Sequence, residues 1–381
     1  MKLLRLISHV TVAGCILCQG SAFTASGRTI QTPRTLAATE STYSDSSTTT
    51  TSTEQPVGDI LILDHLNINH EEGRHDWLNA FYFDFLGLAV DPRKEENYKS
   101  GQKTVWANAG AQQFHLPEGT PNAQVLSGQV VLVYPDLTVL QDRVTPVASK
   151  LDGSQFAVVN TNDDALLVTD PWGSSFRLEQ GASEQQYRDP RGLQPGALSE
   201  CLAMRDLTIY TPVTANLDGI ARFYQHIFDA PVLSLDAKKC VISVGPKQTL
   251  TFETKEGIDE VSHHVDLRQE EEVEGMPSFL SNYGPHISMY VADLPACYRR
   301  ADELGLPYVN PRFKRRAYNL EQAVDDCMFR CIDIVDPERP QDGVILQLEH
   351  EVRSVVKRDG SLYKSCPFDE VPDAVKKSGN Q

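Results

Sequence analysis

Hydrophobic and polar positions alternate along the chain in a pattern that repeats. The run at 60–69, Ile-Leu-Ile-Leu-Asp-His-Leu-Asn-Ile-Asn, predicts a strand whose alternate positions become polar toward its end. A helix is predicted over Trp77–Leu86, because its aromatic residues fall at helical spacing and Gly87 follows as a C-cap. Three short strands are then expected, at Leu88–Val90, Thr104–Ala107 and Gln112–Leu116. The predicted order of this unit is βαβββ.

The same order is predicted in three further units. The second has a helix at Leu137–Val147 and strands at Gln129–Val133, Phe156–Asn160, Ala165–Thr169 and Ser175–Glu179. The third has a helix at Leu217–Phe228 and strands at Asp206–Tyr210, Val232–Leu235, Val241–Val244 and Thr249–Thr254. The fourth has a helix at Ala296–Leu304 and strands at His286–Val291, Tyr308–Val309, Met328–Val335 and Val344–Glu349.

Short sequence words recur at equivalent places in these units. Phe81-Tyr82 lies in the first predicted helix and Phe223-Tyr224 in the third. Units two and four share an Asp-Leu pair before the helix and an Asp-Pro pair before the last strand, at 136–137 and 293–294, and at 170–171 and 336–337. Fixed element order together with repeated turn chemistry indicates an internal repeat and an α+β fold.

Four βαβββ units paired into two domains resemble the vicinal-oxygen-chelate superfamily, which includes glyoxalases, bleomycin-resistance proteins and ring-cleaving dioxygenases. The resemblance covers 58–182 and 200–353, with 183–199 as a linker and 354–381 as a tail. It implies two glyoxalase-like domains, each a cupped half-barrel around one cavity. It also implies divalent-metal ligands on the first and last strands of each unit, where the ion acts as a Lewis acid toward a substrate with two adjacent oxygens.

Carried onto the N-terminal pair of units, the resemblance implies His65 and His115 as metal ligands, with Gln129 and Arg177 at the two other positions. A guanidinium does not coordinate metal, so Arg177 departs from the pattern, although Glu179 lies on the same strand face. The alternative is a metal-free pocket, in which Arg177 binds a carboxylate or phosphate and His65 and His115 donate hydrogen bonds. The candidate substrate-binding residues are Arg177, Gln129 and Glu179.

Carried onto the C-terminal pair, the resemblance implies Asp206, Glu253, His286 and Gln347 as metal ligands, with Glu349 on the same face as Gln347. This set resembles the glyoxalase I type, with the glutamine and carboxylate positions exchanged. Zn, Ni, Mn and Fe all remain possible ions. The alternative is that His286 and Glu253 pair with each other in a polar cup.

Composition restricts the partners. The formal net charge of −17 over 381 residues disfavours nucleic acid and stable association with anionic membranes, which leaves a small-molecule ligand or a protein partner. Cysteine spacing fits neither a zinc finger nor a disulfide scaffold, so we expect free, packed thiols. Because one chain supplies both domains, a monomer is expected.

The N-terminus predicts targeting. Residues 1–22 combine a basic start with a short apolar run and small residues, which is typical of a signal peptide. Residues 23–39 carry Arg28 and Arg34 but no acidic residue, like a transit peptide, and Phe23 stands just after the expected cleavage point. The sequence thus resembles a bipartite plastid presequence that runs, with a Ser/Thr-rich linker, to residue 57. Secretion is the alternative.

Two functions remain open at this point. One is a metal-dependent lyase, isomerase or dioxygenase acting on a small oxygenated metabolite. The other is a non-catalytic small-molecule-binding protein of the same fold. A third, structural possibility is that one domain has lost its site and serves as a dimer-like partner for the other.

Overall fold

The computed structural model describes residue 55 and residues 57–101, 104–119, 122–161, 165–181, 198–259, 285–310, 313 and 315–377. The predicted presequence and nearly all of the predicted linker at 183–199 lie outside the described residues. Within the described part of the chain, no helix combines the length and the apolar character that crossing a membrane would require.

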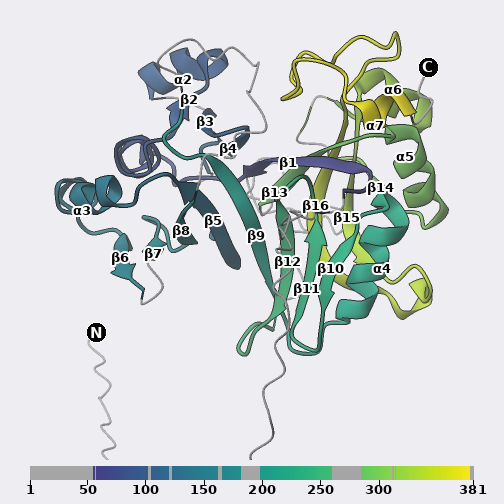
Figure 1. Ribbon diagram of the computed structural model, residues 1–381, viewed down its shortest axis with the longest axis horizontal. Helices are drawn as coiled ribbons and strands as arrows, with labels where there is room; N and C mark the ends of the chain where they lie inside the picture. The colour runs from purple at the N-terminus through teal and green to yellow at the C-terminus, as the bar shows by residue number, and fades with distance from the viewer. Residues whose placement is uncertain are drawn as a thin grey trace, which may run out of the picture. The chain divides into compact units, whose positions relative to one another are not determined.

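Two eight-stranded sheets contain all sixteen strands of the described residues (Figure 1). The first sheet has the order β14 (Pro307–Tyr308), β15 (Met328–Val335), β16 (Val344–Ser354), β13 (His286–Val291), β1 (Ile60–Asn67), β4 (Gln112–Leu116), β3 (Val105–Ala109), β2 (Ala89–Val90). The second has the order β10 (Val232–Leu235), β11 (Lys239–Ser243), β12 (Thr249–Thr254), β9 (Ala203–Thr211), β5 (Gly128–Tyr134), β8 (Ser175–Gln180), β7 (Ala165–Thr169), β6 (Ala157–Asn160).

These strands confirm the α+β class and the four βαβββ units, paired into two open, glyoxalase-like half-barrel sheets. Each unit contributes one main helix. These helices are α1 (His75–Leu78) continued by a π-helical segment (Asn79–Phe85), α3 (Thr138–Lys150), α4 (Leu217–Phe228) and α5 (Leu294–Glu303). Gly87 follows the first of these with φ +62°, the left-handed conformation that its place at the helix end requires.

The sheets join the units in a different combination from the one that chain order suggests. β1 of the first unit pairs antiparallel with β13 of the fourth, and β5 of the second pairs antiparallel with β9 of the third. Each sheet therefore contains one unit from 58–182 and one from 200–353. The expected domain boundaries remain a prediction, but each sheet combines strands from both sides of the predicted linker.

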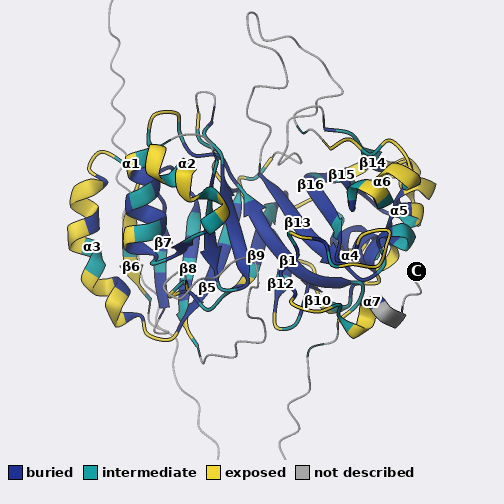
Figure 2. Ribbon diagram, turned by 90° about the horizontal axis from the view of Figure 1, so that it is seen from above, coloured by how far each residue is buried: buried dark blue, intermediate teal, exposed yellow. Residues whose placement is uncertain are grey.

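Consecutive units in the chain instead contact each other through side chains of their helices. Phe81 in the first unit packs edge-to-face against Phe176 on β8 and Phe156, both in the second unit. The hydroxyl of Tyr224 on α4 in the third unit is hydrogen-bonded to Nε2 of His350 on β16 in the fourth, 2.6 Å away. Burial of both sheets follows from this arrangement, and Figure 2 shows the strands mostly buried while α3 presents many exposed residues.

Three helices lie outside the repeated pattern: α2 (Glu95–Ser100), α6 (Leu320–Asp326) and α7 (Asp373–Lys377). Short 3₁₀ turns occupy Pro92–Lys94 and Pro340–Asp342. The stretch after β16, predicted as a tail, packs by Tyr363, Phe368 and Val375 into a second hydrophobic cluster with Tyr290 on β13. All six described cysteines are buried and free, as expected.

Candidate functional site

A cavity of about 430 Å³ lies against the first sheet. Both units of that sheet line it, and so does the segment that follows β16. Its walls carry an unusual concentration of imidazole and charged side chains for a buried sheet face. Its lining residues include His65, Lys94, Trp106, His115, His286, Phe313, Arg315, Arg330, Glu351, Arg353 and Tyr363.

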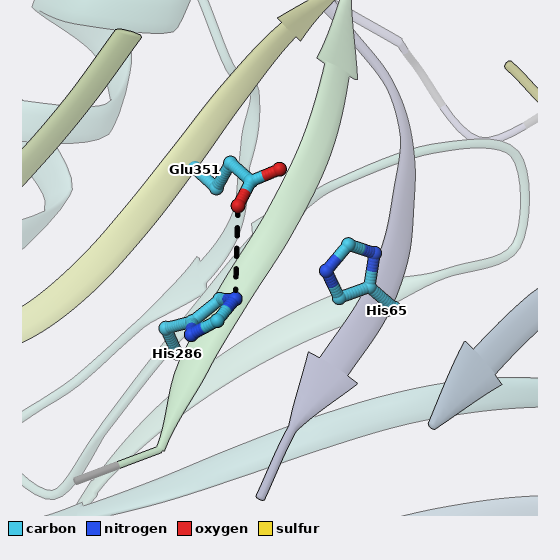
Figure 3. Close-up of side chains that lie close together, drawn as sticks. All are labelled: His65, His286 and Glu351. Carbon is cyan, nitrogen blue, oxygen red and sulfur yellow. Dashed lines mark ion pairs between the residues drawn. The ribbon is translucent and has the colours of Figure 1, made fainter. Parts of the chain in front are cut away.

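Three of these side chains form a cluster of metal-ligand type. The potential ligand atoms of His65, His286 and Glu351 all lie within 4.8 Å of one another, and the three residues are at most 4% exposed. Figure 3 shows His286 directed toward Glu351, with the His65 ring beside them on β1. The His286 Nε2 atom and the Glu351 Oε2 atom are 3.7 Å apart.

Strand register explains why these residues meet. Ser288 on β13 is opposite His65 on β1 and opposite Glu351 on β16, so β13 lies between the two. His286 is two residues before Ser288, and residues two apart on a strand point to the same face. One face of three adjacent strands therefore presents the whole cluster.

Both histidines are held neutral. Burial lowers the pKa of His65, although Asp64 accepts a hydrogen bond from its Nδ1 atom at 2.8 Å. Burial and the charge of Arg330 lower the pKa of His286 well below its ordinary value. The Nε2 atom of His65 is buried and has no hydrogen-bond partner among the described residues. A neutral imidazole with a buried, unpartnered nitrogen is suited to coordinate a cation.

Glu351 is ionised at neutral pH. Burial by itself raises the pKa of this carboxyl group, but the charges of Arg330 and Arg353 outweigh burial and hold the pKa well below its ordinary value. Both guanidinium groups contact the carboxylate directly. Arg330 also donates to Glu349, at 2.6 Å, and lies over the Phe313 ring. The carboxylate is therefore fixed in place by two cations.

An aromatic stack leads from His65 along the cavity wall. The His65 and His115 rings are stacked with centroids 3.6 Å apart, and Trp106 stacks on the other face of His115 at 4.3 Å. The Lys94 ammonium lies 4.6 Å from the Trp106 ring centroid. The stack fixes the orientation of the His65 ring and gives the cavity a flat, weakly polar side.

The sequence-predicted residues separate into the two sheets. His65 and His115 come from the predicted N-terminal set and His286 from the predicted C-terminal set, yet all three line the cavity of the first sheet. Gln347, although on β16 of that sheet, donates to Asp333 at 2.8 Å and does not line the cavity.

The remaining predicted residues lie on the second sheet, where they bind one another or neighbouring polar groups. Asp206 accepts hydrogen bonds from three threonine hydroxyls, Gln129 donates to Ser175, and Glu253 is 41% exposed beside Lys239. Arg177 donates to Glu179 at 2.7 Å. None of these residues lines the cavity described above.

Sequence reasoning missed Glu351, Arg330 and Arg353. The signal for Glu351 was present, because it continues the same-face series of Gln347 and Glu349 by two residues. β16 was predicted to end at Glu349, whereas it extends to Ser354. The two arginines alternate with hydrophobic residues on β15 and β16, and only the strand pairing shows that they flank one carboxylate.

Comparison with known proteins shows similarity at the level of structures only. No protein-family model and no curated protein sequence matches the chain. A candidate dioxygenase from Bacillus subtilis aligns with 83% of this chain and 92% of its own, at 10% identity and a TM-score of 0.45. The 2,3-dioxygenase LapB from Pseudomonas sp. KL28 covers 82% of this chain and 96% of its own, at 9% identity and a TM-score of 0.27. A lactoylglutathione lyase from Agrobacterium tumefaciens covers 31% and 92%, at 17% identity and a TM-score of 0.21.

These scores are too low to support an argument about activity. The likeness to the vicinal-oxygen-chelate fold therefore rests on the four βαβββ units and on the two eight-stranded sheets that they form.

Proposed function

We propose that the chain is a metal-dependent lyase, isomerase or dioxygenase that binds one divalent ion through His65, His286 and Glu351. The observation that carries the proposal is the convergence of these three buried ligand atoms within 4.8 Å on one sheet face. Two neutral imidazoles and one carboxylate, with open positions left for substrate, are a ligand set used for Fe(II) and other first-row metals. When bound, such an ion supplies Lewis-acid or redox chemistry to two adjacent oxygens of a small metabolite.

The residues around the cluster fit this proposal. Asp64 fixes the orientation of His65 from behind, as a carboxylate bound to the remote nitrogen of a ligand histidine does. His115 and Trp106 close one side of the cavity with flat rings, which favours a planar substrate and excludes water from it. Arg330 and Arg353 keep the carboxylate ionised and aligned.

The same two arginines favour a second candidate function. Their positive charges balance the negative charge of Glu351, which a bound metal ion would otherwise balance. A cavity built in this way can hold a small ligand by hydrogen bonds alone. The second candidate is therefore a non-catalytic binding protein that uses the same cavity.

Metal analysis of the purified chain distinguishes the two candidates. We expect about one equivalent of a first-row divalent metal per chain in the wild type and much less in His286→Ala. The matched control is His226→Ala, which removes an exposed histidine on α4 and should leave the metal content unchanged. If neither the wild type nor the control retains or takes up Zn, Ni, Mn or Fe, the enzyme proposal is refuted and the binding protein remains.

A further inference from the structure

We propose that the ligand of this cavity is an organic oxyanion, a carboxylate or phosphate compound, whose charged group binds Lys94 and Arg315. This inference rests on the proposed function for the cavity, and it names the class of substrate. It depends on the charges that line the cavity and on how each of them is compensated.

The inner arginines are already compensated. Arg330 bonds to Glu349 and Glu351, and Arg353 bonds to Glu351 and lies near the Tyr290 hydroxyl. The two arginines and the two glutamates sum to no net charge. They belong to the sheet and to the metal-ligand cluster, and they leave no excess charge for a ligand.

Lys94 and Arg315 are different. Both line the cavity, and neither forms an ion pair with any carboxylate in the part of the chain that the structure describes. Arg93, next to Lys94, is by contrast bound to Asp91. In a chain with a formal net charge of −17, two uncompensated cations in one cavity indicate a site for an anion.

Aromatic side chains hold both cations without neutralising them. Lys94 lies over the Trp106 ring, and Arg315 donates to the Tyr363 hydroxyl with its guanidinium carbon 5.3 Å from that ring's centroid. Aromatic faces and a phenol orient a cation but leave its full charge available to a ligand. Trp106 and Tyr363 thus position two charged donors in the cavity that contains His65, His286 and Glu351.

The proposed substrate has two chemical parts. Its anionic group lies at Lys94 and Arg315, and its oxygen-bearing part lies at the histidine–glutamate cluster. A cavity of about 430 Å³ has room for both parts in one small molecule. Lysine and arginine bind carboxylate and phosphate alike, so the shared oxyanion chemistry is the feature to test first.

Isothermal titration with three probes of similar shape tests the proposal. The probes are benzoate, phenylphosphonate and the neutral analogue benzamide, each titrated at low ionic strength into the full chain after treatment with EDTA and again after metal loading. The variants are Lys94→Gln, Arg315→Gln and the double variant. The matched controls are Lys99→Gln and Arg339→Gln, which change exposed cations that do not line the cavity.

Both anions should bind more tightly than benzamide. Each single variant should weaken anion binding about fivefold, as expected for one charged hydrogen bond at a partly exposed site, and the double variant about twentyfold. Benzamide binding and both controls should not change. A preference for benzoate or for phenylphosphonate then identifies the carboxylate or the phosphate as the natural group.

The proposal is overturned if benzamide binds as tightly as the anions, or if the double variant binds anions like the wild type. It is also overturned if neither anion binds at 50 mM, which is roughly the limit for useful recognition. The EDTA-treated protein contains no metal. Selective anion binding to that protein would therefore still support this inference if the metal proposal failed. Metal uptake without anion selectivity would overturn this inference and leave the metal proposal intact.

Discussion

Replacing Glu351 by glutamine is the sharpest single perturbation of the site. The side chain is 3% exposed and lies between Arg330, 4% exposed, and Arg353, 17% exposed. Glutamine keeps the size of the side chain and removes its charge. Arg330 then retains Glu349 at 2.6 Å, whereas Arg353 retains the Tyr290 hydroxyl at 3.3 Å.

The structure sets the expected magnitude. Removing one member of a buried ion pair costs about 3–5 kcal/mol of folding free energy, because the remaining charge stays buried without its partner. Arg330 keeps one carboxylate, so we expect about 3 kcal/mol, the lower end of that range. Glu253→Gln is the control: its carboxylate is 41% exposed and 3.8 Å from Lys239, so its loss should cost less than about 1 kcal/mol.

Urea denaturation at pH 7.5 measures both effects, first with EDTA and then with excess metal. Metal at about 100 times its Kd should add about 2.7 kcal/mol to the wild type and to Glu253→Gln. Glu351→Gln should gain far less, because it lacks one ligand. A Glu351→Gln protein within about 1 kcal/mol of the wild type would refute the energetic argument. A full metal gain in that variant would refute the assignment of Glu351 as a ligand.

Two further predictions concern stability. Burial lowers the pKa of His70 and of His350 to about 4, below the unfolded value of about 6.5. Their contribution to the free energy of unfolding is therefore present above pH 6.5. It is lost as the pH falls toward 4, by about 3 kcal/mol for each residue. A melting temperature that stays constant from pH 7.5 to 4.5 would contradict this. Asp170→Ala removes the carboxylate that accepts from the backbone N–H groups of Trp172, Gly173 and Ser174, so chemical denaturation should show a loss of about 3 kcal/mol. Asp136→Ala, which removes an exposed turn carboxylate, should lose far less, and equal losses would show that burial of the Asp170 turn is irrelevant.

Much of the local structure could be predicted from the sequence. The helix Leu217–Phe228 and the strands His286–Val291 and Met328–Val335 begin and end where periodicity places them. The helix and the strand His286–Val291 each have one apolar face, and Met328–Val335 is an almost continuous apolar run interrupted only by Arg330 and Asp333, so hydrophobicity alone defines all three. The first helix is less regular, because its buried aromatic cluster is accommodated by a π-helical segment after Leu78.

The site could be predicted only in part. Alternation assigns a face to each strand residue but does not identify the neighbouring strand, so His65 and His286 were each identified without being placed together. Glu351 lies beyond the predicted end of its strand, since β16 is extended by pairing with both β13 and β15. The order of the units along the chain favoured sheets made of consecutive units. Side chains that meet although they are 220 or more residues apart in the sequence leave no local sequence pattern.

The pairing of β1 with β13 also has a consequence for biogenesis. Because β1 begins at Ile60 and its partner β13 begins at His286, one edge of β1 stays unpaired in a growing chain until most of the protein has been synthesised, while β4 pairs with the other edge. Contacts at such separation slow folding. The proposed ligand cluster is complete only once Glu351 has been synthesised, and the part of the chain before residue 183 supplies only His65 of its three members. A gene divided at residues 183–199 should accordingly yield two insoluble fragments when they are expressed apart, and the pocket should return only where both are made together.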